Sequence, residues 1–288
     1  MTATILDGHA IAERIKRELA SELARLGSGR PVPTLASVQI GDQAASALFI
    51  RAQARHAAGL GIQMRTVRVA GDVNQVELES RIRDLNVDAG VHGIFVQNPL
   101  PSHLDAQRIS AAIDPLKDVE GIHPQNSARR FFGRGRIGSC TALAVMELIE
   151  STGVDLKGKE SVVIGHSEIV GRPVTMLLLD ALATTTVCHV GTTAAGRLTD
   201  HVKRAEVLVV AVGQPRLIKG EWIKSGAVVI DVGINVIAGK VVGDVEFEAA
   251  AKRAAFISPV PGGVGPVTVV MVMKNLVEAF KLQQGVTR

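Results

Sequence analysis

The stretch ESVVIGHSEIVGRPVTMLLLDALATTTVCHV, residues 160–190, decides the fold class of this chain. It reads as a buried strand at 160–165, a turn that contains glycine, a helix, and a second strand at 184–190. Two further apolar blocks follow, AEVLVVAVG at 205–213 and GAVVIDVGI at 226–234. Strands that are continuous runs of Val and Ile, separated by helices, are typical of a parallel sheet covered on both faces. The pattern therefore predicts an α/β domain built from βαβ units.

The first half of the chain predicts a second set of alternating helices and strands. Apolar residues at helical spacing beside charged ones mark the helices, and short β-branched runs mark the strands. The tail at 268–282 also reads as a helix, which would pack back on the first domain. We expect two α/β domains, one at 1–140 completed by the helix at 269–288, and a Rossmann-like sheet at 141–268. The expected helices of the first half cover 9–26, 44–59 and 74–86, and the strands cover 34–41, 64–69 and 92–96.

Composition and charge exclude several classes of protein. With 288 residues, 47% hydrophobic and 21% charged, the chain can bury enough apolar surface to fold, which excludes a disordered or disulfide-stapled protein. The net charge of +4 is spread along the chain, with no aromatic residues between the basic ones. That distribution disfavours a nucleic-acid interface and leaves a basic pocket for an anionic ligand open. The basic run Arg129, Arg130, Arg134 and Arg136 reads as a solvated face.

Neither a membrane segment nor a metal site is indicated. The N-terminus reads as a short strand and an amphipathic helix rather than a signal peptide, and the longest apolar runs are too short to cross a bilayer. Cys140 and Cys188 lie far apart without ligand spacing, so we expect reduced thiols and no metal. His123, His166 and His189 show no spacing of a catalytic triad and read as satisfied polar residues. The sequence predicts a cytoplasmic protein without nucleic-acid or membrane partners.

Polar turns at strand ends are the first candidates for function. VHGIFVQNPLP at 91–101 ends a predicted strand in a proline-rich turn, and KDVEGIHPQN at 117–126 is a second polar turn. Such loops converge on the ligand crevice of parallel α/β sheets, so their side chains are candidates for binding or catalysis.

A glycine turn follows the strand at 160–165. Gly165 holds the first position of a dinucleotide fingerprint, but Ser167 holds the second, and Gly171 comes one residue late. By spacing alone the match is weak, and a plain tight connection remains an alternative. A Gly-x-Ser turn at a helix N-terminus nevertheless presents backbone N–H groups and a hydroxyl to a phosphate.

The segment at 258–266, SPVPGGVGP, contains three prolines and three glycines. We expect it to be irregular. It reads either as an interdomain linker or as a rigid loop whose glycines let a ligand approach the backbone, and the prolines favour the second interpretation.

Together these motifs give the chain a resemblance to a known family. From ILDG at 5–8 to the C-terminal helix, it is similar to the bifunctional methylenetetrahydrofolate dehydrogenase/methenyltetrahydrofolate cyclohydrolase family. The resemblance implies two α/β domains around a cleft that holds the active site, a folate substrate, NAD or NADP on the second domain, and a homodimer. The motifs that carry it are VQ-x-PLP at 96–101, KDV-x-G at 117–121, Gly-x-Ser-x-x-Val-Gly-x-Pro at 165–173, VAVGQP at 210–215, VIDVGIN at 229–235 and PVPGGVGP at 259–266.

Several residues that the family uses in its chemistry are replaced here. The family's Ser-x-x-Tyr-x-x-x-Lys reads SALFIRAQ at 46–53, with Phe49 for the tyrosine and Gln53 for the lysine. Its Asp-Val-Asp-Gly has Glu120 as the third residue. Of the four polar side chains that the family places around the folate, only Gln97, which would orient the substrate, is intact.

These replacements affect the two family reactions differently. Oxidation of methylenetetrahydrofolate needs no protein base, because the substrate's own nitrogen supplies the electrons, whereas hydrolysis of the methenyl product needs proton transfer. Gln53 cannot take up a proton at neutral pH, although Glu120 offers a carboxyl group as an acid or a pterin contact. We therefore expect NAD(P)-dependent oxidation with cyclohydrolase activity lost or impaired. Two alternatives stay open: a catalytically silent or re-purposed paralogue that binds nucleotide or folate, and an oxidoreductase acting on another cyclic amine or pterin.

The resemblance also assigns individual positions. Family members that prefer the 2′-phosphate have Arg and Ser where His166 and Val190 stand, which favours NAD slightly, although Arg172 can partly compensate. The catalytic positions are Phe49, Gln53, Gln97 and Glu120, and the substrate-binding positions are Phe49, Gln97, Asn98, Pro99, Glu120, Pro261, Gly262 and Gly263. The cofactor-binding positions are Thr141, Gly165, His166, Ser167, Ile169, Val170, Arg172, Pro173, Val190, Val212, Gly213 and Ile234.

Overall fold

The computed structural model describes residues 2–27, 30–42 and 44–286, and the chain divides into two compact units. Unit 1 consists of Met1–Glu13 and Thr141–Thr268, and unit 2 consists of Arg14–Cys140 and Val269–Arg288. No helix of the described residues is both long and apolar enough to cross a membrane.

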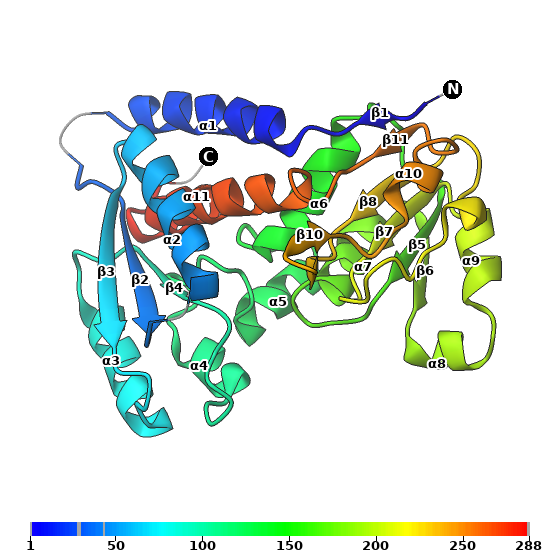
Figure 1. Ribbon diagram of the computed structural model, residues 1–288. Helices are drawn as coiled ribbons and strands as arrows, with labels where there is room; N and C mark the ends of the chain where they lie inside the picture. The colour runs from blue at the N-terminus through cyan, green and yellow to red at the C-terminus, as the bar shows by residue number, and fades with distance from the viewer. Residues whose placement is uncertain (1, 28–29, 43, 287–288) are drawn as a thin grey trace. The chain divides into compact units, whose positions relative to one another are not determined.

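Unit 1 contains a six-stranded sheet in which every neighbouring pair is parallel (Figure 1). This confirms the predicted α/β class with a parallel sheet. The N-terminal residues were expected in the first domain, but they join this sheet because β1 pairs with β11. The strand order is β1 (Thr4–Ile5), β11 (Phe256–Ile257), β8 (Val228–Asp231), β7 (Val207–Val210), β5 (Glu160–Ile164) and β6 (Thr184–Cys188).

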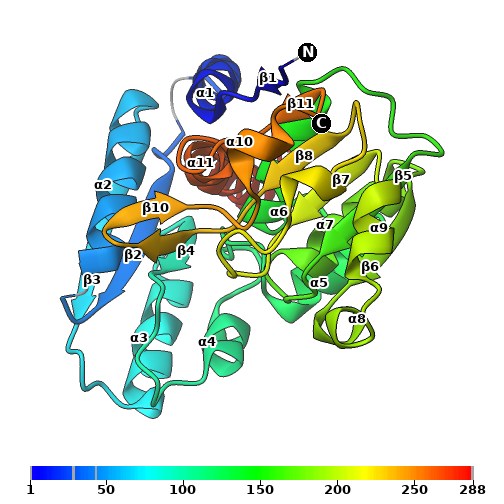
Figure 2. The ribbon, with the colours of Figure 1, turned by 45° about the vertical axis from the view of Figure 1, so that its right-hand side comes forward.

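Short helices and one hairpin complete unit 1. The strand expected at 184–190 ends at Cys188, because the Nδ1 atom of His189 accepts a hydrogen bond from the Gly191 N–H and caps the next helix. The antiparallel hairpin of β9 (Asn235–Ile237) and β10 (Lys240–Val242) follows β8 in the chain and forms a separate two-stranded sheet (Figure 2). The helices are α6 (Cys140–Glu150, with Cys140 in unit 2), α7 (Gly171–Asp180), α8 (Val190–Ala194), α9 (Leu198–Arg204), η1 (Gly220–Trp222) and α10 (Phe247–Ala250).

Unit 2 is built on a three-stranded parallel sheet. Apolar side chains from one face of β2 and β4 pack against α3 and α4, and form a core that includes Val38, Ile82, Ile94 and Ile109. The strand order is β3 (Gln63–Val69), β2 (Thr34–Ile40) and β4 (Gly93–Val96). The helices are α1 (Gly8–Arg25, whose first residues lie in unit 1), α2 (Ala44–Gly59), α3 (Gln75–Val87), α4 (Ala106–Ala112), α5 (Pro124–Phe131) and α11 (Val264–Gln283, whose first residues also lie in unit 1).

The prediction of an irregular segment through Pro266 was partly wrong. Helix α11 begins at Val264, so Pro266 lies in its first turn. A proline is tolerated there because the first N–H groups of a helix have no partner within the helix.

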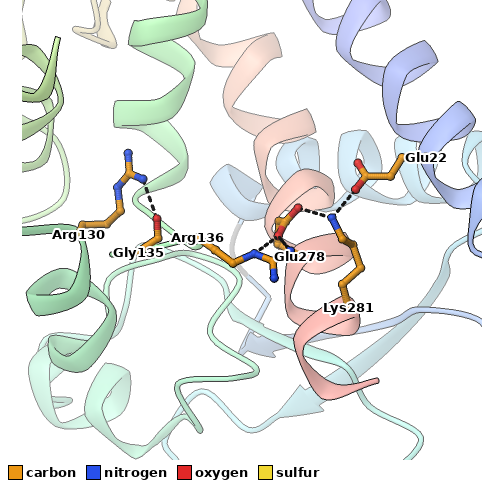
Figure 3. A network of polar contacts seen from close by, with 6 residues as sticks. All are labelled: Glu22, Arg130, Gly135, Arg136, Glu278 and Lys281. Atoms are coloured by element: carbon orange, nitrogen blue, oxygen red, sulfur yellow. Dashed lines mark hydrogen bonds and ion pairs between the residues drawn. The ribbon is translucent and has the colours of Figure 1, made fainter. Parts of the chain in front are cut away.

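The prediction that the arginines at 129–136 form only a solvated face was also partly wrong. Arg136 donates its Nε–H to Glu278 Oε2 at 2.8 Å, and Glu278 also contacts Lys281, which pairs with Glu22 at 2.5 Å (Figure 3). Burial alone would raise the pKa of Glu278, but the hydrogen bond from Lys281 and the charges of Lys281 and Arg136 hold it below its usual value. These contacts tie α1, α11 and the segment before α6 together within unit 2.

Candidate active site

A cluster of buried amide side chains lies in unit 2. Gln53 comes from α2, Gln97 follows β4, and Ser37 stands on β2; all three are almost completely buried. Gln97 donates from Nε2 to Ser37 Oγ at 2.8 Å and to Gln53 Oε1 at 2.7 Å. The structure therefore brings together two of the four predicted catalytic positions and adds Ser37, which the sequence analysis missed.

The amide nitrogen of Gln53 has no hydrogen-bond partner within the part of the chain that the structure describes. Because Gln97 donates to Gln53 Oε1, the Nε2 group of Gln53 is left to serve another acceptor. A buried donor without a partner costs roughly 1–3 kcal/mol, which a bound acceptor would offset. The uncharged Gln53 side chain thus has a buried donor group that no described residue satisfies.

The second polar element of unit 2 is the loop around Asp118. Asp118 is buried and accepts hydrogen bonds from the backbone N–H groups of Gly121 and His123, both at 2.9 Å, and from Asn126 Nδ2 at 2.9 Å. These bonds fix the backbone on both sides of Glu120. The sequence placed Asp118 in a candidate loop without assigning it this supporting role.

Glu120 is a carboxyl group in an environment that disfavours its charge. Burial, and next the negative charge of Asp118, raise the pKa of Glu120 to about 8. Its Oε1 atom lies 3.5 Å from Asn98 Nδ2, so these two predicted substrate positions are neighbours. At pH 7 the Glu120 carboxyl is mostly protonated, and it can donate as well as accept a hydrogen bond.

Phe49 has a packing role in the structure. Its half-buried ring contacts Phe95 of β4 with ring centroids 5.5 Å apart and a tilt of 32° between the planes. The Phe49 ring thus contributes an apolar surface on α2, one helical turn before Gln53.

Pro99, another predicted substrate position, follows Asn98 through a cis peptide bond and is exposed.

The glycine turn of unit 1 connects β5 to α7. Gly165 has φ +114°, and a Cβ there would overlap the carbonyl oxygen of Ala211; a Cβ at Gly171 would overlap the backbone of Gly165. Both glycines are therefore required by the close approach of backbone segments. Ser167 Oγ accepts from the N–H groups of Val170 and Gly171 at 3.2 and 3.4 Å, so its hydroxyl hydrogen stays available as a donor.

A buried aspartate organises the loop after β7, and the sequence analysis missed it. Asp244 Oδ2 accepts from the N–H groups of Val212 and Gly213 at 2.8 and 2.9 Å, and its Oδ1 accepts from Asn235 Nδ2 at 2.8 Å. Three predicted cofactor positions, Val212, Gly213 and Ile234, therefore lie on segments held by one carboxylate. It stands in GDVEFE at 243–248, and no motif in the sequence marks it.

Asp231, at the end of β8, supports Asp244 in turn. Its Oδ1 accepts from the N–H groups of Gly233 and Asp244, and its Oδ2 accepts from Val245, at 2.9 to 3.0 Å. Burial raises the pKa of Asp231 to about 6, although the three backbone hydrogen bonds act to lower it. Together, Asp231 and Asp244 fix the backbone that follows β7, β8 and β10.

The remaining predicted positions fall in unit 1. Gly262 has φ +104°, and its carbonyl accepts from the Gly8 N–H at 2.9 Å, which ties the glycine-proline loop to the first residue of α1. Within the described residues no three His, Cys, Asp or Glu side chains are placed to hold a metal ion. The unit 1 positions are Thr141 on α6, Ile169 and Val170 in the turn, Arg172 and Pro173 on α7, Val190 on α8, Ile234 after β8, and Pro261, Gly262 and Gly263 before α11.

The residues of unit 1 fit a dinucleotide. The turn after β5 is closed by glycines, Gly213 has φ +64° with open space where a side chain would be, and Val190 and Ile234 are exposed. Backbone N–H groups, a hydroxyl and apolar side chains are the groups that bind a pyrophosphate and its nucleosides.

Comparisons with known proteins agree with this arrangement. Residues 6–120 match the tetrahydrofolate dehydrogenase/cyclohydrolase catalytic domain, and residues 139–284 match the NAD(P)-binding domain of the same family. The chain is 46% identical over 281 residues to a bifunctional protein FolD 2 of Geobacter sulfurreducens, covering 97% of this chain and 98% of the relative.

Solved structures show the same relationship. The bifunctional FolD of Campylobacter jejuni is 40% identical, with a TM-score of 0.92 and coverage of 98% of this chain and 99% of that chain. The methylenetetrahydrofolate dehydrogenase-cyclohydrolase of Trypanosoma brucei, solved with NADP cofactor and an inhibitor, is 40% identical, with a TM-score of 0.92 and 99% of both chains covered. The chain therefore belongs to the tetrahydrofolate dehydrogenase/cyclohydrolase family.

Proposed function

We propose that this protein is an enzyme that oxidises 5,10-methylenetetrahydrofolate to 5,10-methenyltetrahydrofolate with NAD or NADP, and that its cyclohydrolase activity is lost or strongly impaired. Two features carry the proposal: the tight glycine turn at Gly165–Gly171 of unit 1, which fits a dinucleotide, and the buried Gln53 of unit 2, at the position of the family's lysine. The first supports oxidation, and the second separates oxidation from hydrolysis.

The oxidation makes small demands on acid–base chemistry. The methylene carbon loses a hydride while the lone pair of the neighbouring folate nitrogen forms the amidinium cation. NAD(P), when bound, supplies the hydride acceptor. The part of this chain is to bind and orient: Gln97, fixed by Ser37 and Gln53, holds the folate, and the protonated Glu120 adds a hydrogen-bond donor.

Hydrolysis of the methenyl product needs more. Water must attack the amidinium carbon while a proton is taken up, and a group of suitable pKa accelerates such a step by about 10²–10⁴. Gln53 is neutral, and its oxygen is already bonded to Gln97. Its amide nitrogen can hold a substrate acceptor in place but cannot accept a proton.

A spectrophotometric assay of the purified protein tests both halves of the proposal. Methylenetetrahydrofolate is supplied with NAD or NADP, and methenyltetrahydrofolate is then supplied alone. Reduced cofactor without methenyl hydrolysis is the expected result. Rapid hydrolysis would overturn the role given to Gln53. No turnover with either cofactor, despite measurable cofactor binding, would favour a silent paralogue or an oxidoreductase for another cyclic amine.

The homodimer is part of the same proposal. The β9–β10 hairpin exposes Val236, Ile237 and Val241, and these apolar side chains support an interface with a second copy of the chain. Light scattering that gives twice the mass of the chain is expected, and a monomer at all concentrations would contradict it. A cytoplasmic location stays a prediction.

A further inference from the structure

The end of helix α5 in unit 2 exposes two adjacent aromatic side chains. Phe131 and Phe132 are 59% and 69% exposed, and their rings meet edge to face with centroids 5.1 Å apart. Single apolar side chains are exposed on most proteins and need no explanation. Two phenylalanine rings in contact with each other form a larger apolar surface in water, which is a candidate for binding.

Arginines flank this pair of rings on both sides. Arg129 and Arg134 are exposed, and within the described residues neither guanidinium has a hydrogen-bond or ion-pair partner. Residues 121–146 contain no Asp or Glu, so this surface attracts anions. The expectation that no aromatic residue lies between the basic ones is wrong at this place, because Phe131 and Phe132 follow Arg130 and precede Arg134. One reason against a nucleic-acid interface is thereby removed.

The backbone at the end of α5 holds the two exposed arginines in a fixed arrangement. The Arg134 N–H donates to the Arg129 carbonyl at 2.8 Å, and the Gly133 N–H donates to the Arg130 carbonyl at 3.0 Å. With Gly133 at φ +66°, these two bonds form a Schellman motif. The positions of Arg129 and Arg134 in this motif are frequently apolar, whereas here both carry a positive charge.

Two further arginines stabilise the segment that returns from α5. Arg130 Nη1 donates to the Gly135 carbonyl at 2.8 Å, and a Cβ at Gly135 would overlap the Arg130 side chain (Figure 3). Arg136 is paired with Glu278. These side chains support the surface and do not belong to it. We call the surface itself the α5 tip, and it consists of Arg129, Phe131, Phe132 and Arg134.

Three simpler explanations account for only part of the α5 tip. The helix dipole stabilises cations at a helix C-terminus, which explains the arginines but leaves the rings in water. An acidic peptide would pair with the guanidinium groups without supplying planar groups for the rings. A membrane needs a larger apolar face, and the other uncharged exposed residues of α5 are small or polar: Pro124, Gln125, Ser127 and Ala128.

Single-stranded nucleic acid matches both halves of the α5 tip. Its unpaired bases have planar faces that stack on aromatic rings, and each nucleotide carries a phosphate that a guanidinium group can bind. We propose that the α5 tip binds single-stranded RNA or DNA without sequence preference, with the two phenylalanines stacking on bases and the two exposed arginines contacting phosphates. The inference does not rest on the proposed reaction, because none of the four residues is a predicted catalytic, substrate or cofactor position.

Fluorescence polarisation of a labelled oligouridylate of about ten nucleotides tests the proposal on the full chain. Two phosphate contacts on a single strand give a logarithmic salt dependence with a slope of about −1.4. The affinity should therefore fall about sevenfold between about 50 and 200 mM salt. A duplex of the same length should bind several-fold more weakly, because its bases are stacked on one another.

Four variants separate the contributions of rings and charges. Phe131→Ser and Phe132→Ser should each weaken binding of the oligouridylate about tenfold, as expected for the loss of one stacked base. Arg129→Gln and Arg134→Gln should each reduce the salt slope to about −0.7, because one phosphate contact remains. All four positions are on the surface, and circular dichroism should show the fold of the wild type.

Matched controls and three results decide the outcome. Arg17→Gln on α1 and Val87→Ser on α3, both at exposed positions, should bind as wild type. Equal affinities of wild type and Phe131→Ser, or equal affinities for single strand and duplex, would overturn the proposal. Binding to vesicles that contain phosphatidylserine, lost in Phe131→Ser, would assign the α5 tip to a membrane instead. A smaller mass of Phe131→Ser in light scattering would assign it to a contact between copies of the chain.

Discussion

Asp244→Asn is the substitution that best tests how unit 1 holds its cofactor loop. The carboxylate accepts two backbone hydrogen bonds through Oδ2, from Val212 and Gly213, and one side-chain bond through Oδ1, from Asn235. Asparagine offers only one oxygen. If that oxygen accepts from the two backbone N–H groups, the new NH₂ group faces the NH₂ group of Asn235. The Asn235 amide must then rotate to present its oxygen, and it loses its 3.4 Å hydrogen bond to the Val242 carbonyl.

The magnitude follows from these three bonds. A hydrogen bond to a charged group contributes about 1.5–3 kcal/mol and a neutral one about 0.5–1.5 kcal/mol, so each backbone bond to Oδ2 loses roughly 1 kcal/mol when the charge is removed. Part of this loss is offset, because the charge of Asp244 also raises the pKa of Asp231 and disfavours its ionised form. We expect the free energy of unfolding to fall by about 2 kcal/mol.

Two measurements check the reasoning. Urea unfolding of wild type and variant gives the change in stability, and KM for NAD and NADP reports whether the loop after β7 has moved. Cofactor KM should rise several-fold while KM for the folate stays within twofold. Asp180→Asn, at an exposed aspartate at the end of α7, is the matched control. If the Asp244→Asn protein has the stability and cofactor KM of this control, Asp244 does not hold the loop after β7 in place.

Three further predictions concern unit 2. Gln53→Lys should raise methenyltetrahydrofolate hydrolysis by about 100-fold, because a buried amine of lowered pKa can act as a base. Glu120→Gln should remove a pH dependence of stability. Native Glu120, with a pKa of about 8, keeps a proton that the unfolded chain releases near pH ~4.3, so wild-type stability falls as the pH rises between these values. The difference corresponds to about 5 kcal/mol, which solvent screening at this half-buried side chain reduces to about 2–4 kcal/mol, and the variant lacks this slope. Asn275→Ala should cost about 2–4 kcal/mol in urea unfolding, because the buried Asn275 amide donates to the carbonyls of Val119 and Gly138 at 2.9 and 2.8 Å.

Each of these predictions has a contradicting result. Gln53→Met, which removes the amide without adding a base, is the control for Gln53→Lys. Equal hydrolysis by both variants would show that a lysine at position 53 does not act as a base. A wild-type stability that rises with pH from 5 to 8 relative to Glu120→Gln would show that Glu120 is ionised in the folded chain. An Asn275→Ala protein within 0.5 kcal/mol of wild type, roughly the scatter of surface substitutions, would show that those carbonyls find other donors.

The longer parallel strands and helices α1, α2, α3, α7 and α11 could be predicted because each has a clear pattern in its own sequence, whereas α6 and the short strands β9, β10 and β11 were not predicted. The helix expected at 44–59 is α2 with the same bounds, since an Ala- and Arg-rich run ends there at a glycine. Helices α4 and α5, with seven and eight residues, are too short for a periodic pattern and depend on caps from Asp105 and His123. Such short helices are selected by tertiary contacts, which a local pattern does not contain.

The candidate site could be predicted in its parts but not in its connections. The motif at 96–101 pointed to Gln97, and the resemblance at 46–53 pointed to Gln53, but nothing in the sequence indicated that Gln97 donates a hydrogen bond to Gln53. Asp244 accepts a hydrogen bond from Val212 because the segments after β7 and β10 come together in space, although they are distant in the sequence. The pairing of the two imidazoles at His166 and His189 likewise follows from the parallel register of β5 and β6.

The pairing of β1 with β11 has a consequence for how the chain acquires its structure. The strand Thr4–Ile5 is made long before its partner, Phe256–Ile257, because about 250 residues separate the two in the chain. Unit 2 is in the same situation, because it is completed by Val269–Arg288. Contacts between segments so distant in sequence slow folding, since the intervening loop must be closed before they form. Unit 1 cannot complete its sheet before Phe256–Ile257 has been made, and unit 2 cannot be completed before Val269–Arg288 has been made.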